Sequence, residues 1–411
     1  MQLNEQQMEQ VRRQIGRVKA FEGGLYHRKY ADIHPEDIRT EADFTALPFT
    51  EKDELRSVYP LGIQAVPDRD IVRIHSSSGT TGTPIIVPYT KKDVDDWAMM
   101  FARCYEMAGI TAEDRIHITP GYGLWTAGIG FQLGCERLGA MAIPMGPGNT
   151  DKQLKMMVDM GSTVLCATSS YALLLAEEIA KRGIGDQIKL RKGVIGSERW
   201  GDKMRARIAN ELGVELYDIY GLTEIYGPGI GINCQKEEPM HYWDDFVYIE
   251  IIDPHTGERV PDGTIGEIVI TTLQKEGAPL IRYRTHDLSR IVPEPCSCGC
   301  QFPRIDRIIG RSDDMIKVKG VNIYPGQVED VLKTVEGVSS EYQVMIDHLN
   351  GRDIMTLFFE TDPTADKETV EQLVGTAFKI KVGLTIVPKS VAIGELPRSE
   401  KKSTRIFDNR Y

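Results

Sequence analysis

Short apolar runs alternate with amphipathic stretches over residues 71 to about 235. The runs span residues 115–119, 140–144, 163–167 and 193–196, and helical patterns at 152–160 and 171–182 lie between them. Apolar runs of this length are typical of buried strands, and their alternation with helices indicates β–α units in a mostly parallel sheet. We therefore predict an α/β core for this part of the chain.

Different patterns flank this core. Residues 1 to about 65 predict helices and loops, including a helix that Thr50 caps, with Asp53 three residues further on. Closely spaced strand patterns at 246–252, 266–272 and 288–292 predict an antiparallel β subdomain over about 243–309.

The C-terminal residues predict a small α+β domain that follows a hinge at Gly310–Asp314. Its expected elements are a strand at 315–318, a helix at 325–334, strands near 341–347 and 354–360, a helix at 367–382 and a strand at 390–393. A chain of 411 residues is long enough for two or more domains. We predict a large N-terminal domain over 1–310, which includes the β subdomain, and a small mobile domain over 311–411.

Composition narrows the class of protein. With 41% hydrophobic and 27% charged residues, the chain has the make-up of a soluble globular protein. No apolar run approaches the roughly 18 residues of a membrane span, and the polar start lacks a signal-peptide core. We therefore expect a cytoplasmic protein without a membrane partner. The net charge of −11 argues against a nucleic-acid partner. A homodimer is the default expectation at this size.

A loop of small polar residues follows the apolar segment at 71–74. It comprises Ser76, Ser77, Ser78, Gly79, Thr80, Thr81 and Gly82. Its glycines let the backbone approach a ligand closely, and its hydroxyls and N–H groups suit a phosphate chain. It matches neither the Walker pattern nor the dinucleotide fingerprint. A solvated polar turn is the alternative interpretation.

Two carboxylates stand beside strand patterns at other points of the chain, Glu224 after the end of one and Asp287 at the start of another. In the segment Tyr220-Gly-Leu-Thr-Glu224, the tyrosine offers a flat face for a base, Thr223 a hydroxyl for a phosphate, and Glu224 an oxygen ligand for Mg²⁺. Asp287 can accept hydrogen bonds from both hydroxyls of a ribose. A capped helix and a surface turn are the respective alternatives.

These motifs, in this order, resemble the adenylate-forming superfamily, which includes acyl-CoA synthetases, luciferases and nonribosomal adenylation domains. Further segments, at 121–125, 136–140, 282–285 and 310–315, are similar to its phenylacetate–CoA ligase-like branch. Two positions depart from the pattern. Thr83 stands where the phosphate loop usually has lysine, and Lys401 stands where a glycine usually precedes the catalytic lysine.

The resemblance implies an AMP-forming aryl-acid–CoA ligase with Mg²⁺ as cofactor and ATP and CoA as co-substrates. It gives Lys402, Glu224 and Thr223 catalytic roles, makes Asp313 the pivot of the hinge, and places Lys319 and Gly320 against CoA. Nucleotide contacts are expected from the loop residues 76–82 and from Gly196, Ser197, Glu198, Asp218, Tyr220, Gly221, Thr223, Asp287 and Arg311. The acid pocket is expected to be lined by Tyr122, Trp125, Ala127, Gly128, Phe131 and Ile219. For Trp125 and Phe131, a plain core position is the alternative.

The cysteines suggest a metal site. Seven is an odd number, and a disulfide framework is not expected in a cytosolic chain. Cys296 and Cys298, with Cys234 and His241 upstream, make a set of three thiolates and an imidazole that suits a structural Zn²⁺. Cys300 is an alternate ligand, and free thiols in a loop are the alternative interpretation.

Two other functions stay open. The first is an adenylyltransferase of the same fold without a CoA step, for example one that acts on a deazaflavin cofactor. The second is a noncatalytic nucleotide-binding sensor, which the departures at Thr83 and Lys401 would suit. Turnover that depends on CoA would distinguish the ligase from both.

Overall fold

A computed structural model describes residues 2–77, 83–198, 200–319, 321–349, 352–398 and 405–410. Its contacts divide the chain into two compact units, of which unit 1 comprises 1–146 and 217–308 and unit 2 comprises 147–216 and 309–411. One boundary between the units lies after residue 308, two residues before the domain boundary expected after residue 310. The predicted domains themselves, 1–310 and 311–411, stay a prediction.

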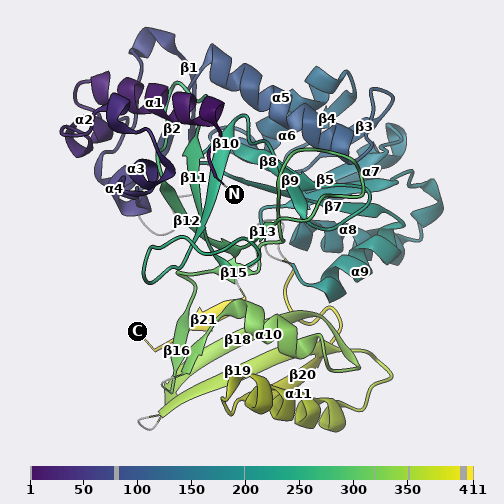
Figure 1. Ribbon diagram of the computed structural model, residues 1–411. Coiled ribbons are helices and arrows are strands. Elements are labelled where there is room, and N and C mark those ends of the chain that lie inside the picture. The colour runs from purple at the N-terminus through teal and green to yellow at the C-terminus, as the bar shows by residue number, and fades with distance from the viewer. Residues whose placement is uncertain are drawn as a thin grey trace. The chain divides into compact units, whose positions relative to one another are not determined.

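Within the described residues, unit 1 begins with four α-helices and continues with strands and two further α-helices (Figure 1). Its helices are α1 (Glu5–Ala20), α2 (Leu25–Lys29), α3 (Glu41–Thr45), α4 (Lys52–Ser57), α5 (Lys91–Met107) and α6 (Thr126–Leu138). Its strands are β1 (Ile71–Ser76), β2 (Ile86–Thr90), β3 (Arg115–Ile118), β4 (Met141–Pro144), β7 (Glu215–Leu222), β8 (Gly227–Asn233), β9 (Met240–Tyr242), β10 (Val247–Ile252), β11 (Gly266–Thr272), β12 (Tyr283–Ser289), β13 (Ile291–Val292) and β14 (Arg304–Ile305).

Strand pairing in unit 1 agrees with the predicted change of pattern. Strands β3 and β4 pair in parallel, whereas β7, β8 and β9 pair antiparallel, as do β10, β11 and β12. The predicted strand at 288–292 covers the end of β12 and all of β13, but β12 already begins at Tyr283. Side chains along β12 alternate between buried and half-buried, and the half-buried positions include Arg284 and His286, whose charges hid the strand in the sequence.

The predicted cap at Thr50 was wrong. Helix α4 is capped by Glu51, which forms a capping box with Glu54. The Thr50 hydroxyl instead donates to the carbonyl of Ile281 at 2.8 Å, so a distant partner has replaced the local one.

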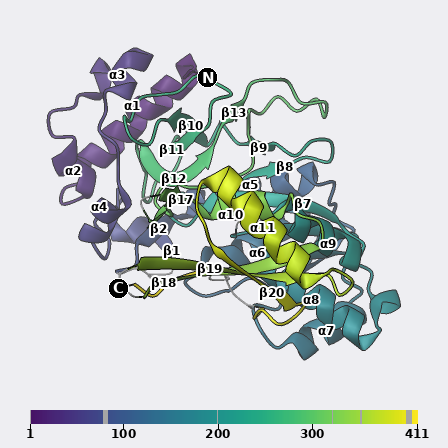
Figure 2. The ribbon, with the colours of Figure 1, turned by 90° about the horizontal axis from the view of Figure 1, so that it is seen from below.

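Unit 2 contains two segments of α/β structure. The first comprises α7 (Thr150–Asp159), β5 (Val164–Thr168), α8 (Ser169–Arg182), β6 (Lys192–Gly196) and α9 (Asp202–Leu212), with β5 and β6 parallel. The second comprises β15 (Gly310–Arg311), β16 (Ile316–Val318), β17 (Val321–Ile323), α10 (Pro325–Leu332), β18 (Val338–Leu349), β19 (Arg352–Thr361), α11 (Lys367–Val382), β20 (Val387–Ala392) and β21 (Ile406–Asp408). Figure 2 shows α10 and α11 on the sheet β20-β19-β18-β21.

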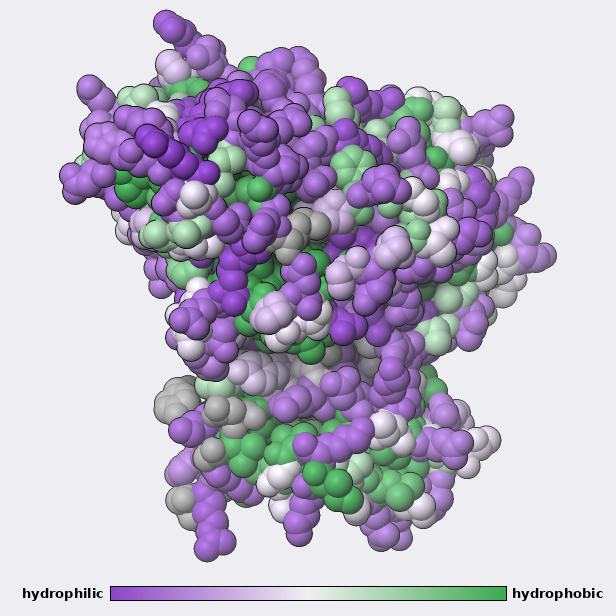
Figure 3. All heavy atoms as spheres, viewed as in Figure 1, coloured by the Kyte–Doolittle hydropathy of each residue, from purple (hydrophilic) through white to green (hydrophobic). Residues whose placement is uncertain are grey.

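Each segment of unit 2 has its own apolar core. One core gathers Leu165, Tyr171 and Ile208 with their neighbours, and the other gathers Val331, Leu357 and Phe378 with theirs. Hydrophilic side chains cover most of the face seen in Figure 3. Among the described residues, every helix is too short or too polar to cross a membrane. These observations confirm the predicted fold class: parallel β–α units, an antiparallel β region and a separate α+β C-terminal domain.

Candidate active site

The Ser/Thr/Gly loop connects two antiparallel strands. Ser76 at the end of β1 pairs with Ile86 of β2, and Ser77 closes the base of the connection by accepting from the Ile85 N–H through its hydroxyl at 3.0 Å. Residues 78–82, which carry most of the predicted phosphate contacts, lie outside the described residues. The next element after the loop is strand β2, which begins at Ile86.

The end of β7 and the turn that follows it bring two sequence signatures together. The Tyr220 hydroxyl donates to the Asp287 carboxylate at 2.8 Å, and both side chains are buried. The Thr223 hydroxyl lies 3.2 Å from that of Thr126 at the start of α6. Asp218, on the same strand, has its N–H bonded to the Asn233 side chain at 2.6 Å. The predicted base, phosphate and ribose contacts of unit 1 thus share one region, with Gly221 in the same strand.

Glu224 is buried, and its charge is met by Lys52 from the first turn of α4. The Lys52 Nζ atom lies 3.0 Å from Glu224 Oε1, yet within the described chain that oxygen accepts no hydrogen bond. A buried carboxylate with spare acceptor capacity suits a hard cation such as Mg²⁺, which proteins commonly hold through one or two carboxylates and the substrate's phosphates. The residues present therefore fit the metal that the family implies.

Side chains from distant segments fix the turn after Glu224. The Lys275 ammonium donates to the Ile225 carbonyl, the Tyr89 hydroxyl donates to the Tyr226 carbonyl at 2.9 Å, and the Trp97 indole donates to the Pro228 carbonyl at 2.8 Å. Lys275 is fully buried, and its Nζ atom lies 3.9 Å from the centre of the Tyr89 ring. Sequence reasoning missed Lys52 and Lys275, because a lone lysine carries no local signal.

Other predicted nucleotide residues lie in unit 2. Glu198, just after Gly196 and Ser197, accepts three hydrogen bonds at the start of α8, from the Ser169 hydroxyl at 2.9 Å and from the Ser170 N–H and hydroxyl at 3.0 and 2.8 Å. Its carboxylate therefore serves as a helix cap in this structure.

The hinge residues are paired with each other. The Arg311 guanidinium makes two contacts of 2.8 Å with the Asp313 carboxylate. Lys319 has a left-handed backbone (φ 49°), and its ammonium lies 3.4 Å from the Thr385 carbonyl. Gly320 and Lys402, the remaining predicted CoA-binding and catalytic residues, lie outside the described residues. All of these roles stay predictions.

The predicted acid-pocket residues lie in α6, in the segment before it and, for Ile219, in β7. Trp125, the N-cap of α6, is 45% exposed and so is not a core residue, whereas Phe131 is buried with its ring centre 4.8 Å from that of Phe101. Gly128 donates its N–H to the Gly121 carbonyl at 2.9 Å, and a methyl group there would lie 2.7 Å from that oxygen. Tyr122 and Ala127 are half-buried, and Ile219 is buried. Their contact with an acid stays a prediction.

The predicted cysteine–histidine set does converge. The ligand atoms of Cys234, His241, Cys296 and Cys298 all lie within 4.8 Å of one another. The sulfurs of Cys234 and Cys296 are 3.6 Å apart, and Cys298 Sγ lies 3.4 Å from His241 Nε2. A tetrahedral zinc ion would place such sulfurs about 3.8 Å apart. His241 Nδ1 lies 2.8 Å from the Phe302 carbonyl, which leaves Nε2 free to act as a ligand.

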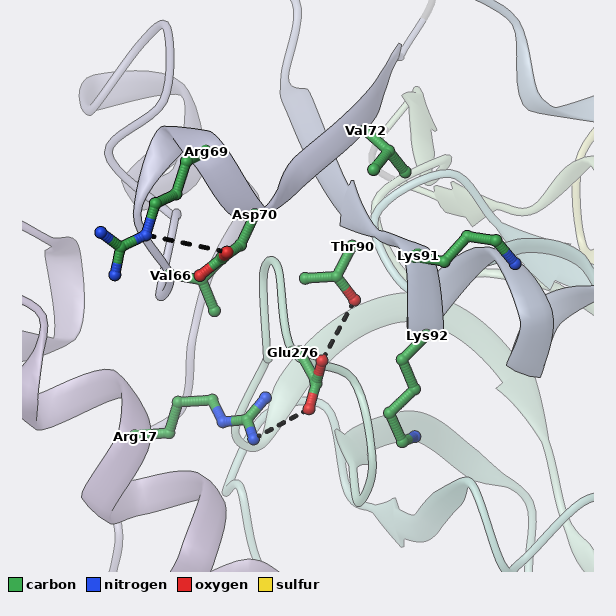
Figure 4. Close-up of a pocket in the computed structure, with 9 residues that line it drawn as sticks. All are labelled: Arg17, Val66, Arg69, Asp70, Val72, Thr90, Lys91, Lys92 and Glu276. Carbon is green, nitrogen blue, oxygen red and sulfur yellow. Dashed lines mark hydrogen bonds and ion pairs between the residues drawn. The ribbon is translucent and has the colours of Figure 1, made fainter.

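A separate pocket of about 500 Å³ lies in unit 1. Figure 4 shows its lining: Arg17, Val66, Arg69, Asp70, Val72, Thr90, Lys91, Lys92 and Glu276. Glu276 already accepts from the Thr90 hydroxyl and from Arg17, each at 3.2 Å. The lining contains no predicted site residue, so the pocket is distinct from the candidate active site.

Comparison with known proteins shows the family to which this chain belongs. The model of the family described as "AMP-binding enzyme" matches residues 26–274, and that of the "AMP-binding enzyme C-terminal domain" matches residues 320–410. The chain therefore belongs to the AMP-binding enzyme family, and the predicted adenylate-forming resemblance is confirmed.

Its relatives narrow the class further. The chain is 41% identical over 397 residues to a phenylacetate-coenzyme A ligase of Escherichia coli K12, and 40% identical over 399 residues to one of Pseudomonas putida. In each case the match covers 94% of this chain and 90% of the relative. The phenylacetate–CoA ligase-like branch, predicted from the sequence, is thereby confirmed.

Solved structures show the same fold. A 2-hydroxyisobutyryl-CoA ligase in its postadenylation state, in complex with 2-HIB-AMP, matches 98% of this chain and 89% of its own, with 25% identity and a TM-score of 0.88. The same ligase with 2-HIB-AMP and CoA, in its thioesterification state, matches equal shares with 26% identity and a TM-score of 0.71.

Proposed function

We propose that this protein is an AMP-forming aryl-acid–CoA ligase. It would join a carboxylate to ATP, forming an acyl-adenylate and releasing pyrophosphate, and the CoA thiol would then displace AMP to form a thioester. The observation that carries the proposal is the hydrogen bond between Tyr220 and Asp287, because it joins two nucleotide signatures that lie far apart in the sequence. The near-complete match to phenylacetate–CoA ligases supports it.

The side chains have defined tasks in this reaction. A carboxylate must approach the anionic α-phosphate, so positive charge is needed where negative charge develops. Lys402 is proposed to supply it, and Asp287 to hold the ribose. Glu224 would hold Mg²⁺, which neutralises phosphate charge when bound. Rotation of the C-terminal domain about Asp313 would then bring Lys319 and Gly320 toward CoA, a conformational step of a known kind.

Measurement of pyrophosphate release tests the function. The purified protein is incubated with ATP, Mg²⁺ and a panel of aryl and alkyl acids, with and without CoA. We expect turnover with phenylacetate or another aryl acid that requires CoA. Release without any effect of CoA would indicate an adenylyltransferase. Failure of every acid, with retained ATP binding, would favour a nucleotide-binding sensor.

We further propose a structural zinc ion held by Cys234, His241, Cys296 and Cys298. Three thiolates and one imidazole close a tetrahedral shell, so the metal would have no open position for catalysis. It would join β9 and the segment that follows β8 to the loop between β13 and β14. Cys300 lies outside this group of four, and its N–H contacts the Cys298 sulfur at 3.4 Å.

The cellular setting completes the proposal. We propose a cytoplasmic enzyme, because a reducing compartment keeps zinc-binding thiolates intact. We also propose domains at 1–310 and 311–411, supported by the separate core of the C-terminal segment and by the start of the second family match at residue 320. A homodimer is proposed on size alone, and light scattering of the purified protein tests it.

A further inference from the structure

Arg398 links the two segments of unit 2. It lies four positions before Lys402, at the end of a described stretch of the chain. Toward the C-terminal segment, its guanidinium contacts both oxygens of Glu360 on β19, at 2.8 and 3.0 Å. Toward the other segment, the same guanidinium contacts both oxygens of Glu177 on α8, at 2.7 and 3.1 Å. Arg398 therefore makes a bidentate ion pair with a carboxylate of each segment.

The contact with Glu360 is part of a rigid attachment. The side chain of Glu360 is fully buried and that of Arg398 is 8% exposed. Glu360 Oε1 also accepts the N–H groups of Gly394 at 2.9 Å and Leu396 at 3.3 Å. Charge-assisted, forked bonds of this kind fix orientation as well as distance. The turn that leads toward Lys402 is thus held on β19.

The contact with Glu177 reaches the neighbouring segment. Glu177 also pairs with Arg207 of α9 at 2.7 Å, so negative and positive groups alternate from Arg207 through Glu177 and Arg398 to Glu360. Other contacts from α9 cross the same boundary, among them an ion pair between Asp202 and Lys333, which directly follows α10. Lys203 donates to the single carbonyl of Val335 at 2.9 Å.

We propose that Arg398 is a positioning residue for acyl-adenylate formation, acting through its bond to Glu177. The proposal rests on the ligase function above. By fastening the turn before Lys402 to α8, the Arg398–Glu177 pair would favour the arrangement that serves the first half-reaction. Thioester formation requires the C-terminal domain to move, so this pair would break there.

The test compares Glu177→Gln with Glu178→Gln. The first change removes one charge of the link but leaves Arg398 paired with buried Glu360, which avoids an uncompensated charge in the core. Glu178 is the matched control, because it lies on the same helix and pairs with Arg182 at 2.8 Å and Lys181 at 3.1 Å instead. Two rates are measured separately, acyl-adenylate formation from ATP and phenylacetate, and thioester formation from synthetic phenylacetyl-adenylate and CoA.

We expect Glu177→Gln to slow acyl-adenylate formation about tenfold, the loss of about 1.4 kcal/mol of transition-state stabilisation. Thioester formation from the supplied adenylate should be unchanged or faster, and Glu178→Gln should alter neither rate. Equal slowing of both steps by Glu177→Gln would show a merely structural role and overturn the proposal, as would no slowing of either. Failure of the proposed function would be evident separately, because the wild-type protein would then lack one or both activities.

Discussion

Tyr220 and Asp287 are joined by a buried hydrogen bond of 2.8 Å, in which the tyrosine hydroxyl donates to Oδ2 of the carboxylate. The bond orients the carboxylate that we propose holds the ribose. The two residues come from different sheets, so the proposed nucleotide site depends on how β7 and β12 are placed against each other.

Replacement of Asp287 by asparagine should weaken ATP binding. Asparagine offers one acceptor oxygen where aspartate offers two, so one ribose bond is lost and the KM for ATP should rise about tenfold, with a smaller change in kcat. Initial rates over a range of ATP concentrations measure this. Asp306→Asn, which alters an ion pair with Arg290 in the same unit, is the control. An unchanged KM in Asp287→Asn would contradict the ribose role.

Loss of the Glu224 charge should raise the Mg²⁺ requirement. Glu224→Gln removes the buried anion that Lys52 now faces at 3.0 Å, and a neutral amide is a poorer ligand for Mg²⁺. We expect at least about tenfold more Mg²⁺ for half-maximal rate, and calorimetry should show weaker binding of Mg²⁺-ATP. Exposed Glu113→Gln serves as the control. Identical Mg²⁺ titrations for Glu224→Gln and wild type would remove this carboxylate from the metal site.

The zinc proposal predicts one metal ion per chain. Elemental analysis of protein purified without added metal should find about one zinc per chain, and Cys298→Ser should lose most of it. Because ligand loss couples to folding, the melting temperature of Cys298→Ser should fall by about 5 °C or more. Cys300→Ser is the matched control and should keep both metal and stability. Zinc lost equally from the two variants would mean that the ligand set is misassigned.

Lys275 should make stability depend on pH. Burial lowers the pKa of Lys275 from 10.5 to about 7, so between these values the unfolded chain holds a proton that the folded chain has released. The contribution of Lys275 to the free energy of unfolding therefore rises as pH rises through this window. Lys275→Met lacks the titration, so its stability relative to wild type should fall between pH 7 and pH 9.5.

Urea unfolding at several pH values measures this difference. Gln274→Leu, a neighbour without a titratable side chain, should differ from wild type by the same amount at every pH. The free energy of unfolding of Lys275→Met, relative to wild type, is expected to fall with pH. A value that rises with pH or stays constant would show that burial does not lower the pKa of Lys275.

Local sequence patterns determined much of the fold. The helix predicted at 367–382 is α11 and the strand predicted at 266–272 is β11, because their apolar spacing and, for α11, the Asp366 cap are contained within the segment. The strand predicted at 288–292 merges the end of β12 with β13 and misses the start of β12 at Tyr283, for the opposite reason. Arg284 in β12 is stabilised by Glu267 on the neighbouring strand at 2.8 Å, a partner that no local pattern reveals.

In the candidate site, too, some residues could be predicted from local sequence and others could not. Tyr220, Glu224 and Asp287 were identifiable as candidates because their residue types suit a nucleotide and stand in recognisable motifs. The four proposed zinc ligands were identifiable because few ligand sets combine thiolates with an imidazole. Lys52, Lys275 and Arg398 were not, since a lysine or arginine acquires its role only from the groups that burial places beside it. The sequence by itself thus determined which chemistry the chain carries. Only the tertiary structure decided which charges are buried and paired, because desolvation and contact between distant segments arise when the chain folds.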